Sequence, residues 1–228
     1  MKKLNALRKT FKYYNIDGYI VPKNDEFFGE YVNDSNDRLK FISSFTGSAG
    51  YALILRKKSY LFVDGRYTLQ AFKESGEKFK IVEIYKKKPS DIIDKLRKKI
   101  TIGYDPQLLT KSTTNNLFVS SKCNLKLIQE NLVDKIWNKK NKMQIKKFYI
   151  LPEKHIGESY KNKIKRTIIK MKSMNVDKLL ITAPENIAWL MNVRGKDSKF
   201  SPIPNCNAVL NLSGEIDLIV DERKIDKK

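Results

Sequence analysis

The spacing of apolar residues changes repeatedly between a helical and a strand pattern along this chain. Near the N-terminus, apolar side chains recur every three or four positions, at Leu4, Leu7, Phe11 and Tyr14. That period predicts an amphipathic helix, and the short apolar run at 19–21 predicts a buried strand after it. Because the two patterns alternate through the chain, the sequence predicts an α/β fold with mixed sheets flanked by helices.

Turn-forming residues divide the rest of the chain into further elements. Strands are expected at 51–55, 59–63, 80–84, 101–104, 125–128 and 179–181. Helices are expected at 67–75, 110–121 and 160–174, and another is expected to begin near Pro89. The polar segment 24–36 is expected to be a loop or a short helix.

A stretch near the start of the chain returns after its middle. Residues 12–17 are similar to residues 172–177, which lie 160 positions later, and residues 61–66 are similar to 218–223, which lie 157 positions later. Both copies predict a helix, a strand, a loop, a hairpin and an Asp-x-Arg sequence. Chance can produce one such match, but two in the same order at nearly the same offset indicate an internal duplication.

The duplication predicts two related domains. The expected boundaries are a first domain at 1–129, a Lys- and Asn-rich linker at 130–152 and a second domain at 153–228. The first copy continues past Arg66 with further strands and helices, whereas only five residues follow Arg223. The second domain is therefore expected to be truncated, with an uncovered sheet, and more chain is expected after Lys228.

The chain carries a formal net charge of +21. A large basic excess is compatible with a nucleic acid, a membrane surface or acidic partners. Only eight of the 46 basic residues are arginine, the residue that base and phosphate recognition favours, and the lysines are spread along the chain. The densest cluster lies at 135–147. We therefore expect solvated basic faces and a basic linker, and no nucleic-acid partner.

The sequence gives no sign of a secreted or membrane-spanning protein. No apolar run approaches the roughly 18 residues that a membrane span needs, and no uninterrupted apolar stretch follows the basic N-terminus. Cys123 and Cys206 form no CxxC pair, so two buried or half-buried thiols are expected rather than a disulfide framework or a zinc site. We expect a cytoplasmic protein without a membrane partner.

The residues of this chain do not assemble into a catalytic set. His155 is the one histidine, and a lone histidine cannot build a two-metal site. Ser48 has no base nearby in sequence. Gly47 and Gly50 flank it in a loop that resembles a phosphate-binding loop but lacks the lysine and the spacing of nucleotide-binding motifs. A structural role at the start of a strand is expected there, and no catalytic residue or metal ligand is expected in this chain.

Five segments are similar to one enzyme family. They lie at 37–50, 62–71, 102–106, 130–137 and 185–195. These segments are long and specific, and the resemblance extends over essentially the whole chain. The sequence resembles the Xaa-Pro aminopeptidases (aminopeptidase P), in particular their long, three-domain type.

The resemblance implies that the chain is the N-terminal, non-catalytic portion of a larger metallopeptidase. In that family, two related creatinase-N-terminal-like domains precede a catalytic pita-bread domain, which removes an N-terminal residue preceding proline. The catalytic domain binds two divalent metal ions, usually manganese, through two Asp, one His and two Glu, and none of those motifs is present here. The implied partners are a peptide with proline second, the protein's own catalytic domain and a second copy in a homodimer. Alone, this chain is expected to be inactive.

The resemblance also implies a role for Arg66, which matches the substrate-binding arginine of the family's Asp-Gly-Arg-Tyr motif. A guanidinium pairs well with carboxylate and carbonyl oxygens; the alternative is an arginine that only bridges the turn. Asp64 either orients Arg66 through an ion pair or caps the following helix, and capping is favoured. Arg194 either lies near the catalytic domain or a domain interface, or forms a structural ion pair. Trp189 is expected to pack in the core.

Two other functions are considered. A non-catalytic basic module that binds polyanions or nucleic acid is the alternative function, and the net charge is its only support. A stand-alone scaffold or dimerisation protein is disfavoured, because the uncovered sheet of a truncated second domain would aggregate.

Overall fold

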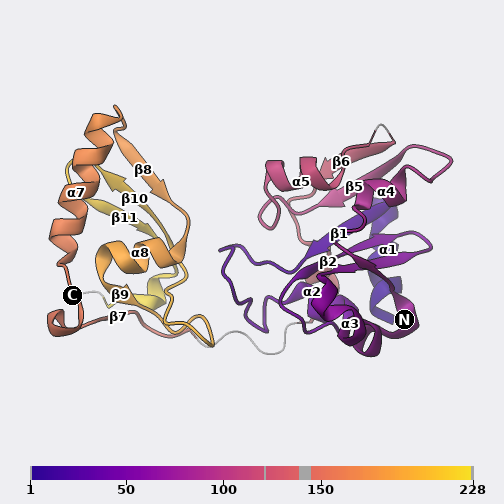
Figure 1. The fold of residues 1–228 in the computed structure, drawn as a ribbon, viewed down its shortest axis with the longest axis horizontal. Coiled ribbons are helices and arrows are strands. Elements are labelled where there is room, and N and C mark those ends of the chain that lie inside the picture. The colour runs from indigo at the N-terminus through magenta and orange to yellow at the C-terminus, as the bar shows by residue number, and fades with distance from the viewer. Residues whose placement is uncertain (1, 121, 139–144, 227–228) are drawn as a thin grey trace. The chain divides into compact units, whose positions relative to one another are not determined.

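The computed structural model describes residues 2–120, 122–138 and 145–226, and the chain divides into two compact units (Figure 1). The first unit comprises Met1–Glu26 and Asp34–Asn141, and the second comprises Phe27–Asn33 and Lys142–Lys228. Each unit has its own sheet and its own apolar core, as separately folded domains do.

A six-stranded mixed sheet forms the centre of the first unit, in the order β4-β3-β2-β1-β5-β6. Its strands are β1 (Gly18–Pro22), β2 (Gly50–Leu55), β3 (Ser59–Val63), β4 (Lys80–Glu83), β5 (Ile100–Tyr104) and β6 (Cys123–Leu127). β2 pairs antiparallel with β1 and β3, whereas β1 with β5, β3 with β4 and β5 with β6 pair parallel. β1 and β3 are buried along their whole length, which fits their continuously apolar sequences.

Helices cover both faces of this sheet. They are α1 (Lys2–Tyr13), α2 (Arg38–Ser43), α3 (Thr68–Ser75), α4 (Pro89–Ile93), α5 (Lys111–Leu117) and α6 (Leu132–Ile136). The core on one face contains residues of α1, α2, α3 and α6, and the core on the other contains residues of α4 and α5. Successive residues of β3 contribute to opposite cores, since Leu61 belongs to the first and Phe62 to the second.

The expected α/β class with mixed sheets flanked by helices is confirmed, and the differences lie mostly at the ends of elements. The helix expected from residue 67 begins one turn earlier as a 3₁₀ turn, η1 (Gly65–Tyr67), and continues as α3. The helix expected at 110–121 is shorter, because Phe118 leaves the helical conformation, with φ −122° and ψ 33°. The segment 24–36 contains turns and bends but no helix or strand.

The segment expected to be a linker begins with a helix of the first unit. The side chain of Asn131 caps α6 by accepting hydrogen bonds from the backbone N–H groups of Val133 and Asp134. Leu132 and Val133 are fully buried in the core that α1 and α2 share. Residues 139–144 of the expected linker lie outside the described residues, and the boundaries at 129 and 152 stay a prediction.

The second unit contains a three-stranded antiparallel sheet in the order β11-β10-β8 and a separate two-stranded ladder of β7 and β9. Its strands are β7 (Tyr149–Ile150), β8 (Lys178–Ile181), β9 (Val193–Arg194), β10 (Asn207–Asn211) and β11 (Ile216–Ile219). Its helices are α7 (Tyr160–Ser173) and α8 (Pro184–Met191), with short 3₁₀ turns η3 (Glu153–His155) and η4 (Glu222–Lys224). Met171 of α7 and Leu190 of α8 are buried against Leu210 of β10.

The internal repeat of the sequence is also a repeat of backbone geometry. Asn15 after α1 and Asn175 after α7 are both left-handed, with φ of 49° and 53°. In each case the next residue donates its backbone N–H to the carbonyl four residues before the asparagine, 3.0 Å away in both copies. The antiparallel order β3-β2-β1 in the first unit corresponds to β11-β10-β8 in the second. The two units therefore share helix, turn, strand and hairpin.

The two copies differ in how their sheets are covered. Leu180 of β8 and Ile219 of β11 are 60% and 57% exposed. The repeat places these two residues at the positions of Ile20 and Phe62, which are fully buried beneath α4 and α5 in the first unit. Within the described part of the second unit, both helices pack on the opposite face of the sheet. One face of this smaller sheet thus presents apolar side chains to solvent.

Arg38 provides a test of how α2 is fixed to the first unit. Its buried guanidinium contacts Glu26 at 2.5 Å and Asp134 of α6 at 2.7 Å. Burial acts to lower the pKa of Arg38, but the hydrogen bonds that its guanidinium donates to Asp134 and Glu26 outweigh burial and raise the pKa. The substitution Arg38→Met leaves two carboxylates without their cation, so we expect the free energy of unfolding to fall by about 3 kcal/mol.

Urea unfolding followed by circular dichroism measures this loss. The matched control is Arg56→Met, because the half-exposed ion pair of Arg56 with Asp17 contributes about 1 kcal/mol or less. Equal unfolding midpoints for the two variants would show that the Arg38 network does not hold α2 and α6 together.

Candidate functional site

Arg66 lies in η1, at the point where β3 ends and α3 is about to begin. The Oδ1 atom of Asp64 accepts a hydrogen bond from the backbone N–H of Arg66 at 3.0 Å, which caps the turn. The same oxygen accepts from Nε of the Arg66 side chain at 2.9 Å. A single carboxylate therefore caps the turn and also fixes the direction of the guanidinium.

The guanidinium of Arg66 keeps most of its donors available. Its side chain is 74% exposed, and among the described residues only its Nε is hydrogen-bonded. The aromatic ring of Tyr67 lies 5.5 Å from the guanidinium carbon. The bond to Asp64 raises the pKa of Arg66 and lowers the pKa of Asp64, so both groups stay charged. The free Nη1 and Nη2 groups form the planar fork that binds a carboxylate with two hydrogen bonds.

The second copy of the motif gives a direct comparison. Asp221 caps η4 by accepting from the backbone N–H of Arg223, and its Oδ1 accepts from Nε at 2.9 Å. Here Nη2 of Arg223 also donates to Oδ2 of Asp221, at 2.6 Å, and this pairing lowers the pKa of Asp221 to about 2. The fork of Arg223 is therefore partly occupied within its own turn, whereas that of Arg66 is not.

A polar cluster fixes α3 beside the loop before β2. Glu74 accepts hydrogen bonds from the backbone N–H and the hydroxyl of Thr46, at 2.7 and 2.6 Å, and Gln70 donates to the same hydroxyl. Ser48 and Tyr67 share a hydroxyl–hydroxyl bond of 2.8 Å. The sequence analysis missed this cluster; its only sequence signal is the four-residue spacing of Gln70 and Glu74 on a helix.

Gly47 and Gly50 of that loop allow the backbone to pass close to neighbouring atoms. A Cβ on Gly47 would lie 2.2 Å from the ring of Phe45, and a Cβ on Gly50 would lie 2.7 Å from the carbonyl oxygen of Phe62. Both positions exclude any larger residue for reasons of space alone. The loop has the structural role at the start of a strand that the sequence analysis expected.

Arg194 bonds to carbonyl groups and to no carboxylate of the described residues. Its Nη1 donates to the carbonyl oxygens of Ala188 and Val193, each at 2.9 Å. Ala188 belongs to the last turn of α8, where unpaired carbonyls attract a cation. The structure thus gives Arg194 a local contact with the end of α8 and does not bring it together with Arg66 or Asp64 in one unit.

The expectation that Trp189 packs in the core is wrong. Ile187 and Leu190 take the inward positions of α8, and Trp189 points away from them and is half-exposed. Lys163 and Arg166 of α7 place their cationic groups 4.7 and 5.4 Å from its indole ring. The helical period puts Trp189 off the buried stripe, so its surface is covered by cations instead of apolar side chains.

The remaining candidate residues of the sequence are two cysteines and one histidine. Cys123 is half-buried and Cys206 is buried, both are free thiols as expected, and burial raises the pKa of each to about 11. His155 is exposed in η3. The described residues contain no group of three or more His, Cys, Asp or Glu side chains that could hold a metal ion. No helix within these same residues is long and apolar enough to cross a membrane.

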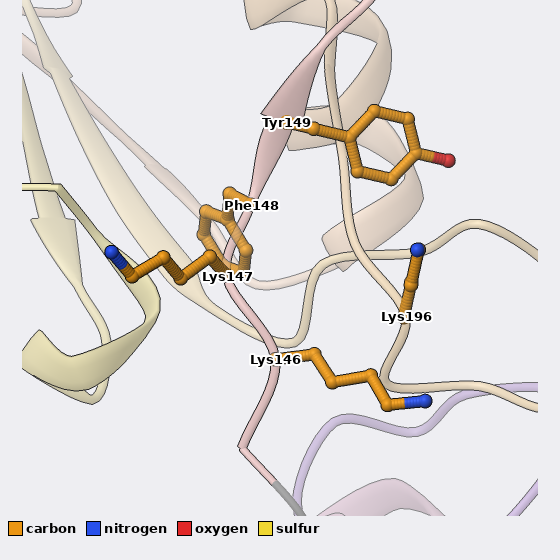
Figure 2. Close-up of a pocket in the computed structure, with 5 residues that line it drawn as sticks. All are labelled: Lys146, Lys147, Phe148, Tyr149 and Lys196. Carbon is orange, nitrogen blue, oxygen red and sulfur yellow. The ribbon is translucent and has the colours of Figure 1, made fainter.

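The second unit has an open basic depression of about 610 Å³ (Figure 2). It is lined by Lys146, Lys147, Phe148, Tyr149 and Lys196. Figure 2 shows Lys147 pointing away from Tyr149, and Lys147 pairs with Asp226. Lys196 lies 5.8 Å from the centre of the Tyr149 ring, and neither Lys146 nor Lys196 forms an ion pair with a described residue. The depression therefore offers two ammonium groups to an anion.

Family models match both halves of the chain. A model of the creatinase/prolidase N-terminal domain matches residues 3–132, and a second model of the same description matches residues 138–228. A probable Xaa-Pro aminopeptidase P of Coprinopsis cinerea is 32% identical over 233 residues, which cover 99% of this chain and 37% of that protein. An aminopeptidase P1 of Lotus japonicus is 31% identical over 229 residues, which cover 97% of this chain and 35% of that protein.

A solved structure matches the fold over the same length. It is the X-prolyl aminopeptidase of Caenorhabditis elegans, described as a cytosolic enzyme with a di-nuclear active site. It has a TM-score of 0.89 and 25% sequence identity, and the match covers 99% of this chain and 39% of that one.

The chain spans less than two fifths of the length of these relatives. The resemblance to Xaa-Pro aminopeptidases that the sequence motifs carry is confirmed, and so is the expectation of two related domains of one fold. The chain belongs to the creatinase/prolidase N-terminal domain family.

Proposed function

We propose that this chain is the N-terminal, non-catalytic portion of a metal-dependent Xaa-Pro aminopeptidase, which removes the N-terminal residue of a peptide that has proline second. The observation that carries the proposal is the match of nearly the whole chain to little more than a third of each such enzyme. The relatives are hydrolases of peptides by name, and this chain contributes the domains that precede the peptidase part.

The metal chemistry is assigned to the part of the relatives that this chain does not span. The related enzyme of Caenorhabditis elegans is described as having a di-nuclear active site, and we propose two divalent ions, manganese in both positions, for the full-length protein. The described residues of this chain offer no metal-binding cluster, so none of them is proposed as a ligand. Bound metal would supply Lewis-acid activation of the scissile carbonyl.

Within this proposal, Arg66 binds the substrate. Its free Nη1 and Nη2 groups suit a carboxylate or carbonyl oxygen of the peptide, and its bond to Asp64 holds the fork outward. Asp64 is a positioning residue, because among the described residues its carboxylate accepts hydrogen bonds only from the turn and the guanidinium. Arg194 has a supporting role through the carbonyl groups at the end of α8.

We also propose the two-domain division expected from the sequence, at 1–129 and 153–228, with the α6 part of the expected linker at 130–152 packed in the core of the first unit. The exposed Leu180 and Ile219 support a second domain that further polypeptide completes, since their counterparts in the first unit are buried.

A cytoplasmic location is supported by the cytosolic description of the related enzyme. A homodimer is proposed as the assembly of the full-length protein.

The role of Arg66 is tested in the full-length protein with the substitution Arg66→Ala. We expect kcat/KM for an Xaa-Pro peptide to fall about tenfold to a hundredfold, as the loss of a charged hydrogen bond of about 1.5–3 kcal/mol implies. Arg66→Lys, which keeps the charge but not the fork, should recover only part of this loss. The control is Arg223→Ala, which removes the equivalent guanidinium of the second copy. Unchanged kcat/KM for Arg66→Ala would exclude a substrate-binding role.

The completion of the second sheet is tested with Leu180→Lys in the full-length protein. If further polypeptide covers this face, the substitution buries an unpaired charge, and the stability of the protein should fall by about 3 kcal/mol. Ile169→Lys is the control, because Ile169 is 61% exposed on α7 and lies on a helix rather than on the sheet. Calorimetric melting temperatures that are equal for both variants would show that the sheet face stays in water.

The basic depression of the second unit favours a second candidate function, the binding of polyanions. Lys146 and Lys196 line it and form no ion pair with a described residue. The double substitution to alanine should reduce the slope of log Kd against log salt by about 1.4 for a single-stranded oligonucleotide, since each phosphate contact to a single strand contributes about 0.7. Fluorescence anisotropy measures this slope. Binding that the double substitution leaves unaltered, or that disappears at moderate salt for every polyanion, would exclude this site.

A further inference from the structure

The first unit has a depression of its own, of about 410 Å³, at the start of β3 and β4. Its lining comes from α1, the hairpin turn at 56–58, β3, the 3₁₀ turn η2 (Gly76–Lys78) and β4. β3 and β4 run parallel, so both strands begin at the same end of the sheet. Arg66 follows the end of β3, and the depression is therefore at the opposite end of the sheet from the candidate substrate-binding residue.

The lining of this depression is strongly basic. Five of its ten lining residues are cations and one, Glu77, is an acid. None of the five cations forms an ion pair with a described residue. A concave surface that carries charges of one sign concentrates ions of the opposite sign. The depression is named the β3 depression, and its cations are Arg8, Lys57, Lys58, Lys78 and Lys80.

Arg8 differs from the four lysines because it is half-buried, whereas they are exposed. Its Nε donates to the carbonyl oxygen of Leu55 at 2.9 Å, and its Nη2 donates to the hydroxyl of Ser59 at 2.8 Å. Both acceptors are neutral, and Nη1 has no hydrogen-bond partner among the described residues. Burial lowers the pKa of Arg8, since no described carboxylate compensates its charge. A partly buried cation of this kind gains free energy when an anion approaches it.

The lysines alone would not indicate a site. An exposed lysine is solvated, and Lys80 at the start of the edge strand β4 also protects that edge from pairing with another chain. Arg8 has no such explanation, because it lies on α1 and its guanidinium is turned toward the sheet. Other arginines of the first unit are paired with a carboxylate, namely Arg38, Arg56 and Arg66.

The backbone around the β3 depression is fixed before any ligand binds. Within the hairpin turn, the N–H of Leu55 donates to the carbonyl of Lys58 at 2.8 Å. The side chain of Arg56 holds the same turn through Asp17, with Nε 3.0 Å from Oδ1. A ligand therefore needs to order little more than the lysine side chains, which favours binding.

We propose that the β3 depression binds a small soluble anion that carries several phosphate groups. Lysine ammonium groups bind phosphate oxygens as point charges, and the guanidinium of Arg8 adds directed donors. The volume lies within the range of about 300–1,000 Å³ that is typical of small-molecule sites. The aromatic residue of the lining, Tyr60, is buried, so it offers no exposed ring for the base stacking that single-stranded nucleic acids need.

Equilibrium dialysis of radiolabelled inorganic tripolyphosphate against the full-length protein tests the site. Magnesium in excess saturates the probe, so that the probe does not remove metal from the rest of the protein. We expect saturable binding of one probe per chain. Arg8→Gln should raise Kd at least about tenfold, as the loss of a charge-assisted hydrogen bond implies.

Exposed positions provide variants that leave the fold intact. The double variant Lys58→Gln with Lys80→Gln should raise Kd about fivefold or more, because it removes two of the five cations. Glu77→Gln should lower Kd about two- to fivefold, because it removes the acid of the lining. The matched control is Lys111→Gln with Lys170→Gln, which removes the same charge from exposed helical positions and should leave Kd unchanged.

Three outcomes would overturn the proposal. The first is the absence of saturable binding. The second is an equal Kd for the two double variants, which would show that the probe binds diffusely to a basic chain. The third is displacement of the probe by a single-stranded oligonucleotide that binds more tightly at equal charge, which would assign the β3 depression to nucleic acid instead of a small anion.

Discussion

The first unit depends on β1, a five-residue strand that is buried throughout and pairs on both edges. On one edge it pairs antiparallel with β2, and on the other it pairs parallel with β5. The antiparallel edge brings in the hairpin of β2 and β3, whose end carries Arg66, while the parallel edge requires the crossover through α3, β4 and α4. The position of Arg66, the candidate substrate-binding residue, therefore follows from how β1 is paired.

The described part of the second unit repeats the helix, strand and hairpin of the first unit. β8 has the place of β1 and pairs antiparallel with β10, but no described strand lies on its other edge. The cost of this arrangement is visible at Leu180 and Ile219, which remain in water where their counterparts are covered. The same physical rule, that a sheet must cover its apolar face, explains the packed first sheet and the half-covered second one.

The two Asp-x-Arg turns of the internal repeat have the same local geometry. They differ in how many donors of the arginine remain available for a ligand. In both turns an aspartate oxygen binds the backbone and the Nε of the arginine two residues on. In the second turn the other carboxylate oxygen also takes Nη2 of Arg223, whereas the fork of Arg66 stays open. A capped turn of this kind becomes a binding device only where the guanidinium is left free.

The sequence by itself determined the class of the fold, the order of most elements, the duplication and the family, because periodicity and motifs are properties of neighbouring residues. It also singled out Arg66 and Asp64, through their match to the Asp-Gly-Arg-Tyr motif of the family that the sequence resembles. Tertiary structure alone decided that α6 belongs to the first unit and that the large residues of α3 point outward. Those outcomes depend on which residues, far away in the sequence, pack against each helix. The spacing of neighbouring residues does not specify that contact.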